Sequence, residues 1–185
     1  METITAAVHI LSPKGVGKKI GYIHFRDSQG GLLIEPELEG LPAGEHGFHI
    51  HEFGNLEPKR NKDGKMVAGL SAGQHYDPEN AGFHGRPDGF GHRGDLPVLE
   101  VDEDGVAEFA VLAPRLSLNE VKGRAIIIHK CGDNYSDHPL PNGGGKSRIA
   151  GGVITNSCPY CEKQKIQTIG TLALIGMGFY AWKNR

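Results

Sequence analysis

The sequence predicts an all-β domain, a sandwich or a barrel, on three observations. Short apolar runs are separated by Gly, Pro and Asp-Ser turn signals, which is typical of short strands. No segment before residue 116 shows a convincing 3.6-residue apolar repeat. The 185 residues fit one domain with a small appendage, and the net charge of −2 excludes a basic footprint for nucleic acid.

The expected strands follow one another along the chain with turn residues between them. In order, they are Thr3–Leu11, Ile20–Phe25, Gly31–Leu38, Glu45–Phe53, Pro97–Val101, Val106–Leu112, Arg124–His129 and Ile149–Thr155. The fifth and sixth should pair as a hairpin around the Asp-Glu-Asp-Gly turn between them. Ser117–Lys122 predicts a single helical turn, because Ser117 can cap it and Glu120 stands three residues further on.

The strand over Glu45–Phe53 carries the first chemical signal. His49 and His51 are two residues apart and therefore point to one face, whereas His46 points to the other. Two imidazoles on one strand face form a bidentate site for copper or zinc. Taken alone, the pair could equally be two solvent-facing polar residues. A second histidine cluster within 25 residues favours the metal site.

That second cluster is Gly73–Pro97, which reads GQHYDPENAGFHGRPDGFGHRGDLP. It holds three histidines and one aspartate, namely His75, His84, His92 and Asp95, and too few apolar residues to bury a core. Three imidazoles and a carboxylate are the ligand set of a closed tetrahedral zinc site. The metal would supply folding free energy that apolar contacts cannot, and would explain the long connection from Gly54 to Leu96. The alternative is a flexible loop with scattered histidines.

Four motifs together resemble the copper/zinc superoxide dismutases, specifically their bacterial branch. They are GFHIHEFG, GQHYDPENAGFHGRPDGFGHRGDLP, IIIHKCGDNYSDHPLP and GGGKSRIAGGVI, and the resemblance runs from about Thr3 to Thr155. It implies a flattened, immunoglobulin-like Greek-key β-barrel with two long functional loops, to which the residues beyond the resemblance would add a C-terminal helical tail. It also implies copper and zinc as cofactors, superoxide as substrate, oxygen and hydrogen peroxide as products, and a possible homodimer.

The resemblance also implies roles for particular residues. The copper ligands would be His49, His51, His75 and His129, and the zinc ligands His75, His84, His92 and Asp95, so that His75 bridges the metals. Asp137 would link copper and zinc ligands, and His46 would brace the copper ligands from behind. Arg148 would be the catalytic cation beside the copper, with Lys146 either steering the anion or simply solvated. His9, His24 and His138 match no ligand position.

The chain departs from the family pattern in one respect. The intrasubunit disulfide of the family would join positions that are Leu56 and Gly151 here, so this bond cannot form. The N-terminal METITAAVHIL also lacks the pattern of a signal peptide. Both features favour a cytoplasmic-facing protein, since disulfides belong to oxidising compartments.

The expected domain comprises residues 1–156, followed by a linker over 157–165. The linker contains Cys158 and Cys161 as Cys-x-x-Cys, which suits a soft-metal site, an intermolecular link or incidental thiols. Residues 166–182 carry no charge, and Tyr180 and Trp182 fit an interfacial belt. Residues 166–185 therefore predict a transmembrane tail anchor, the alternative being a peripheral or partner-packing helix.

Two other functions compete with a dismutase. A non-catalytic copper-binding or copper-delivery protein on the same fold is favoured slightly by the Cys-x-x-Cys pair, but disfavoured by the complete ligand set and Arg148. A cupin-like metal oxygenase is suggested by His-x-His on a strand, but the glutamate expected for it is missing.

Overall fold

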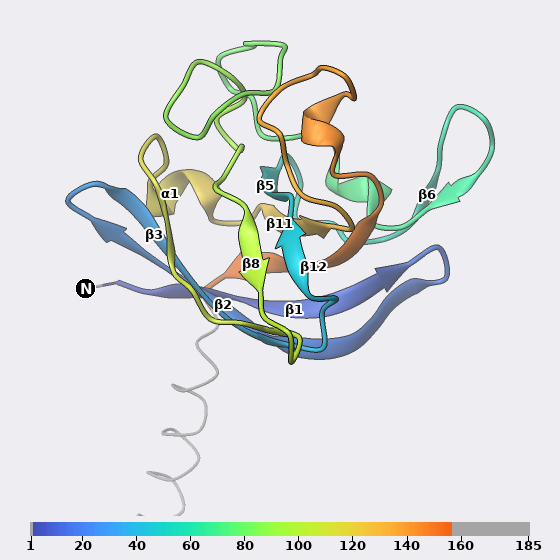
Figure 1. The fold of residues 1–185 in the computed structure, drawn as a ribbon, viewed down its shortest axis with the longest axis horizontal. Helices are drawn as coiled ribbons and strands as arrows, with labels where there is room; N and C mark the ends of the chain where they lie inside the picture. The colour runs from blue at the N-terminus through green and yellow to red at the C-terminus, as the bar shows by residue number, and fades with distance from the viewer. Residues whose placement is uncertain (1, 157–185) are drawn as a thin grey trace, which may run out of the picture.

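Strands form nearly all the regular structure of the computed structural model, which describes residues 2–156 (Figure 1). They are β1 Ile4–Ser12, β2 Gly15–Ser28, β3 Gly31–Glu39, β4 Gly44–His46, β5 Phe48–His51, β6 Lys59–Arg60, β7 Met66–Val67, β8 Leu99–Val101, β9 Val106–Ala107, β10 Val111–Ala113, β11 Ala125–His129 and β12 Arg148–Thr155. One short helix, α1 Leu118–Val121, and two 3-10 turns, Leu70–Ala72 and Asn142–Gly144, complete the described elements. The prediction of an all-β fold is confirmed.

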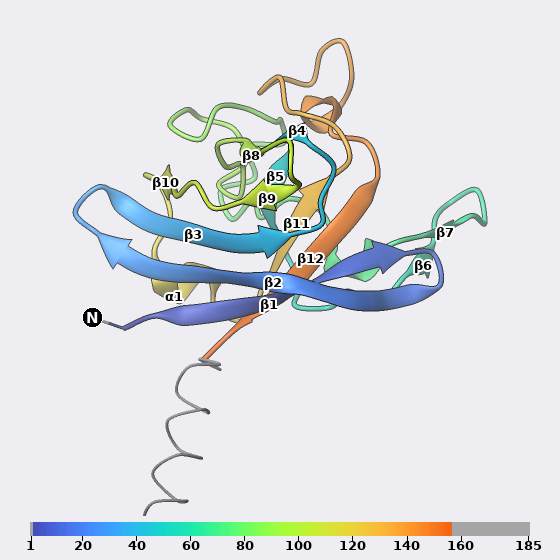
Figure 2. The same ribbon diagram turned by 60° about the horizontal axis from the view of Figure 1, so that its bottom comes forward.

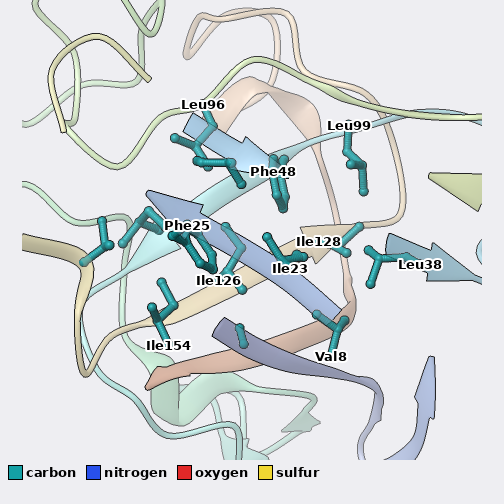
Figure 3. Packing of buried hydrophobic residues seen from close by; sticks show 14 of the residues in the cluster. Val8, Ile23, Phe25, Leu38, Phe48, Leu96, Leu99, Ile126, Ile128 and Ile154 are labelled. Atoms are coloured by element: carbon teal, nitrogen blue, oxygen red, sulfur yellow. The ribbon is translucent and has the colours of Figure 1, made fainter. Parts of the chain in front are cut away.

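The main sheet is antiparallel and curled (Figure 2). Its strand order is β10-β3-β2-β1-β12-β11-β5, and β9 also pairs with β3. The β4–β8 pair and the β6–β7 pair form two separate small sheets. Side chains from β2, β5 and β11, and from the segment leading into β8, meet in one apolar core (Figure 3). Phe25, Phe48 and Ile126 are fully buried there.

The expected strand over Glu45–Phe53 is divided at Gly47. The Gly47 amide donates a 2.7 Å hydrogen bond to the Cys131 carbonyl, and its own carbonyl accepts one of 2.8 Å from the His129 amide. As a result, β4 pairs with β8 while β5 pairs with β11. This division places His46 on a different sheet from His49 and His51.

The expected hairpin between Pro97–Val101 and Val106–Leu112 is wrong. The chain does turn at the expected place, where the Asp102 amide donates a 2.9 Å hydrogen bond to the Val106 carbonyl. However, β8 pairs with β4, whereas β9 and β10 pair with β3. A local turn signal identifies the reversal of the chain but not the strands that lie beside each arm.

The expected helical turn is confirmed as α1. The Ser117 amide donates a 3.0 Å hydrogen bond to Glu120 Oε2, which is the Glu120 half of the capping box that the sequence indicates, and the Ser117 hydroxyl donates one of 2.7 Å to the same oxygen. The amide of Leu118 donates a 2.8 Å hydrogen bond to Asp27 on β2. The helix start is therefore tied to the main sheet.

An apolar cluster occupies the place of the missing disulfide. Leu56, which is 9% exposed, packs with Leu11, Ala68, Ala72, Ala125 and Ile127. A Cβ added at Gly151 would lie 2.8 Å from the Ile126 carbonyl oxygen and from Ile127 Cδ1, so the backbone of this position is closely covered. Cys131 is the free cysteine of the described residues. The loop after β5 is thus anchored here by packing.

Within residues 2–156, no helix has the length and apolar character needed to cross a membrane. The expected linker over 157–165, with Cys158 and Cys161, and the expected tail helix over 166–185 lie outside the described residues.

Leu56→Ala should lower the free energy of unfolding by about 2–5 kcal/mol, because it opens a cavity in the cluster that anchors the loop. Leu140→Ala is the matched control, since this leucine is 48% exposed and its loss should cost less than about 0.5 kcal/mol. Urea denaturation of both variants measures the difference. Equal losses would show that the cluster does not anchor the loop.

Candidate metal centre

Two overlapping groups of buried ligand atoms lie beside β5. The first comprises His49, His51, His75 and His129, and the second comprises His49, His75, His84 and Asp95; within each group the ligand atoms lie within 4.8 Å of one another. All of these residues are buried. His75 belongs to both groups, as the expected bridge between the metals requires, and so does His49. The predicted zinc ligand His92 belongs to neither group.

Two neighbouring strands supply three of the four histidines of the first group, namely His49, His51 and His129. In the β5–β11 ladder, Ile127 faces His49 and Ala125 faces His51. His129 ends β11 at a register shift against β12, opposite Arg148. Because hydrogen-bonded strands have fixed spacing, these three imidazoles are held by the sheet rather than by a loop.

Both ends of the loop that carries the other ligands are pinned to β5. The Ile50 amide donates a 2.9 Å hydrogen bond to the Gly94 carbonyl, and the Ile50 carbonyl accepts one of 2.8 Å from the Tyr76 amide. Gly94 must be glycine, because a Cβ there would lie 2.3 Å from the Ile50 carbonyl oxygen. His75 directly precedes Tyr76 and Asp95 directly follows Gly94, so both lie beside β5, where they form isolated bridges with His51 and His49.

The Asp95 carboxylate gathers three imidazoles. Its Oδ1 lies 2.8 Å from His75 Nδ1, 2.9 Å from His84 Nδ1 and 3.5 Å from His92 Nδ1. Ligand atoms at the corners of a zinc tetrahedron with bonds of about 2.0 Å lie about 3.3 Å apart. The structure therefore brings the predicted zinc ligands together at a spacing that suits this ion.

Five buried ring nitrogens have no hydrogen-bond partner among the described residues. They are His49 Nδ1, His51 Nε2, His84 Nδ1, His92 Nδ1 and His129 Nε2. A buried polar atom left without a partner costs about 1–3 kcal/mol, so five in one place require an explanation. Each nitrogen belongs to a predicted copper or zinc ligand. A copper ion within the first group and a zinc ion beside Asp95, to which His92 Nδ1 also comes within 3.5 Å, would satisfy all five. The residues present therefore fit copper and zinc.

Burial keeps most of these imidazoles neutral and ready to bind a metal. Burial, with the neighbouring His49, lowers the pKa of His75 to about 3. Burial also holds the pKa values of His51 and His129 well below the ordinary value. His84 differs, because the carboxylates of Asp133 and Asp95 outweigh its burial and raise its pKa to about 9. Metal binding at His84 would release a proton near neutral pH.

The carboxylate that links the two groups is Asp133, not Asp137 as expected. Asp133 Oδ2 accepts a 2.6 Å hydrogen bond from His49 Nε2, and its Oδ1 accepts one of 2.8 Å from His84 Nε2. Asp137 instead accepts hydrogen bonds from the backbone amides of His84, at 2.8 Å, and Asn142, at 2.9 Å. Asp133 therefore orients both rings, whereas Asp137 ties two loops together.

The glycine triplet after this loop makes room for the link. A Cβ at Gly143 would lie 1.9 Å from Asp133 Oδ1 and 2.7 Å from His84 Nε2. The backbone there is also left-handed, with φ of 68°. The position of Asp133, four residues beyond His129, is the signal that could have identified it.

The remaining predicted residues surround the first group. His46 lies behind it, with Nδ1 2.7 Å from the His129 carbonyl oxygen and Nε2 2.8 Å from that of Pro42. Arg148 donates 2.5 and 2.6 Å hydrogen bonds to the carbonyls of Gly69 and Gly73, and burial lowers its pKa to about 10. Its guanidinium remains charged at neutral pH.

Two rings of the first group, those of His51 and His129, are oriented by backbone carbonyls. His51 Nδ1 donates to the same Gly73 carbonyl as Arg148, at 3.1 Å, and His129 Nδ1 donates to the Lys146 carbonyl, at 3.2 Å. The Lys146 side chain itself is exposed. His9, His24 and His138 lie outside both groups, as expected.

Comparison with known proteins identifies close similarity to one family. The family model for copper/zinc superoxide dismutase matches residues 19–154. A superoxide dismutase [Cu-Zn] 2 of Salmonella typhimurium is 53% identical over 148 residues, covering 80% of this chain and 85% of that protein.

Two solved structures are similar throughout the described region. One is a Cu/Zn superoxide dismutase from Brucella abortus, with 45% identity and a TM-score of 0.80, covering 83% of this chain and 99% of that one. The other is a solution structure of the monomeric copper, zinc superoxide dismutase from Salmonella enterica, with 50% identity and a TM-score of 0.74 at the same coverage. A homodimer of this chain finds no support in these comparisons.

The expected cytoplasmic-facing location is wrong, because the bacterial copper/zinc dismutases that the chain matches are typically periplasmic. The expected membrane anchor finds no support in these comparisons, and its residues, 166–185, lie outside the described residues. A missing disulfide does not determine location, because the apolar cluster around Leu56 packs where the bond would lie.

Asp133→Asn should lower the affinity for zinc and copper about 10–100-fold, because an amide cannot accept hydrogen bonds from both His49 and His84. Asp137→Asn should have a smaller effect, since one of its two backbone contacts can remain. Metal analysis after dialysis against a graded chelator series compares them. An Asp137 effect as large as that of Asp133 would contradict this assignment.

Proposed function

The chain belongs to the copper/zinc superoxide dismutase family and converts superoxide to oxygen and hydrogen peroxide. We propose the following roles for its side chains in this reaction. His49, His51, His75 and His129 would hold copper, and His75, His84, His92 and Asp95 would hold zinc. The observation that supports this assignment most strongly is the set of five buried, unpartnered ring nitrogens that face the two groups. When bound, copper supplies one-electron redox chemistry, and zinc supplies a redox-inert charge that orders the loop.

His75 would both bridge the metals and handle the proton. Its Nδ1 lies against Asp95, which leaves Nε2 for the group formed with His51 and His129. Its strongly lowered pKa means that the ring carries no extra proton at neutral pH. We assign Nε2 as the atom that takes up a proton and gives it to the peroxide product, since this nitrogen lies on the side of the redox site.

Arg148 would bind and orient the superoxide anion. Its two terminal nitrogens are held by the carbonyls of Gly69 and Gly73, so the position of the guanidinium is set by the loop after β7. Burial is the main cause of the low pKa values of His51 and His129, and the Arg148 charge lowers both further, which places this charge near both rings. A fixed cation beside the redox site attracts a small anion and presents donors to it.

We further propose that residues 1–156 form one catalytic domain, a Greek-key β-barrel. The curled main sheet and the β4–β8 pair around a common core support this architecture. A non-catalytic copper-delivery protein on the same fold is not favoured, because it would not need Arg148 beside a complete pair of metal groups.

His129→Ala should abolish dismutase activity while zinc content stays largely intact, because His129 belongs to the first group and not to the ligands around Asp95. A superoxide turnover assay and metal analysis of the same preparation provide the two readings. Retained activity would remove His129 from the copper ligands.

Arg148→Ala should lower kcat/KM about tenfold or more and weaken its dependence on ionic strength, because steering by a fixed cation is screened by salt. The exposed Lys122 offers a control with the same charge change, and Lys122→Ala should leave both properties close to wild type. Pulse radiolysis or stopped-flow measurement at two salt concentrations tests the pair. Identical behaviour of the two variants would refute this role for Arg148.

A further inference from the structure

One arginine outside the metal groups holds the loop that carries His92. Arg115 lies in the segment between β10 and α1 and is partly buried. Its Nε donates a 3.0 Å hydrogen bond to the Pro87 carbonyl, its Nη1 one of 3.0 Å to Gly91, and its Nη2 one of 2.7 Å to His92. Three backbone carbonyls within six residues therefore converge on one guanidinium.

The planar donor fork of arginine suits this arrangement. A guanidinium presents five N–H groups in a rigid plane, whereas a lysine ammonium is a single point charge on a flexible stem. Hydrogen bonds from a charged donor are about twice as strong as neutral ones. The loop over Gly73–Pro97 has little apolar surface to bury, so these contacts are a main source of its order.

His92 depends on such support more than the other ligands do. Its side chain is 14% exposed, whereas those of His75 and His84 are 3% and 0% exposed. The rings of His49 and His84 are oriented by Asp133, and those of His51 and His129 by backbone carbonyls. Apart from its approach to Asp95, the His92 ring has no polar partner among the described residues. Its backbone must therefore set its position.

The residue after His92 is held from the same side. Arg93 forms ion pairs with Glu120 of α1 and with Glu79 of the loop. Glu120 also closes the capping box with Ser117, two residues beyond Arg115. The segment from Arg115 to Glu120 therefore contacts both His92, through the Arg115 guanidinium, and Arg93, through the Glu120 carboxylate.

We propose that Arg115 is a positioning residue of the zinc site, which fixes the His92 imidazole for zinc by holding the carbonyls of Pro87, Gly91 and His92. This inference rests on the proposed assignment of His92 as a zinc ligand. Arg115 touches neither metal nor substrate, and it acts through the backbone of the loop.

The test is zinc transfer from the copper- and zinc-loaded enzyme to a chromogenic chelator, with copper retention measured in the same sample. Arg115→Met should lower zinc affinity about 10–100-fold, as for other groups that orient a metal ligand, while copper affinity stays within about twofold. Arg115→Lys should give an intermediate loss. Arg86→Met is the matched control, because Arg86 lies in the same loop with its side chain 70% exposed, and it should release zinc like wild type.

A merely structural role is separated by comparing melting temperatures of the copper-only and copper–zinc forms. If Arg115 positions His92, the rise in Tm that zinc confers shrinks in Arg115→Met. An unchanged rise, with both forms destabilised equally, overturns the inference. Should Arg115→Met fail to fold, Arg115→Lys, which keeps the charge, decides the outcome by the same measurements.

His92→Ala separates this inference from the ligand assignment beneath it. Faster zinc release in His92→Ala, with wild-type release in Arg115→Met, refutes the role of Arg115 alone. Wild-type zinc release in His92→Ala refutes the assignment of His92 as a ligand.

Discussion

The metal centre depends on the closure of a long loop onto one strand. The backbone of Ile50 bonds to Gly94 and Tyr76, so the two ends of the segment that carries His75 and Asp95 meet at β5. The same strand carries His49 and His51, which are both buried. A short stretch of backbone pairing thus brings the loop ligands to the strand ligands, although His51 and His75 are more than twenty residues apart in the chain.

The sheet fixes the positions of three imidazoles, and the loops supply the charged groups and the other imidazoles. The β5–β11 ladder places three imidazoles with the spacing of a regular sheet, whereas the loops bring the carboxylates and the remaining imidazoles. Because the loops bury little apolar surface, polar contacts hold them in place. Asp133 accepts hydrogen bonds from two imidazoles, Asp137 accepts them from the backbone of two loops, and Arg115 donates them to three carbonyls. Near Leu56, apolar packing anchors a loop at the place where the family has a disulfide.

Most strands could be predicted, because the alternation of apolar and polar residues and the presence of turn residues are local properties of the sequence. The partners of β8 and β9 could not, since pairing depends on segments far away in the chain. The choice between Asp133 and Asp137 failed for a similar reason. Both lie in one irregular loop, and the partners of each carboxylate, the His49 and His84 rings for Asp133 and the His84 amide for Asp137, come from distant segments. The hydrogen bonds from Arg115 to the loop that carries His92 could not be predicted, because in a sequence an arginine that binds carbonyls resembles any surface arginine.

The amino-acid sequence alone determined the chemistry available to this protein: the number of imidazoles, their spacing along β5 and the glycines that let loops approach the sheet. Those features depend on residue type and on neighbours within a few positions. The tertiary structure alone decided which groups meet. A carboxylate orients two rings, and a guanidinium holds three carbonyls, only after segments remote in the chain have folded together. Distance in space, not in sequence, sets the strength of these contacts.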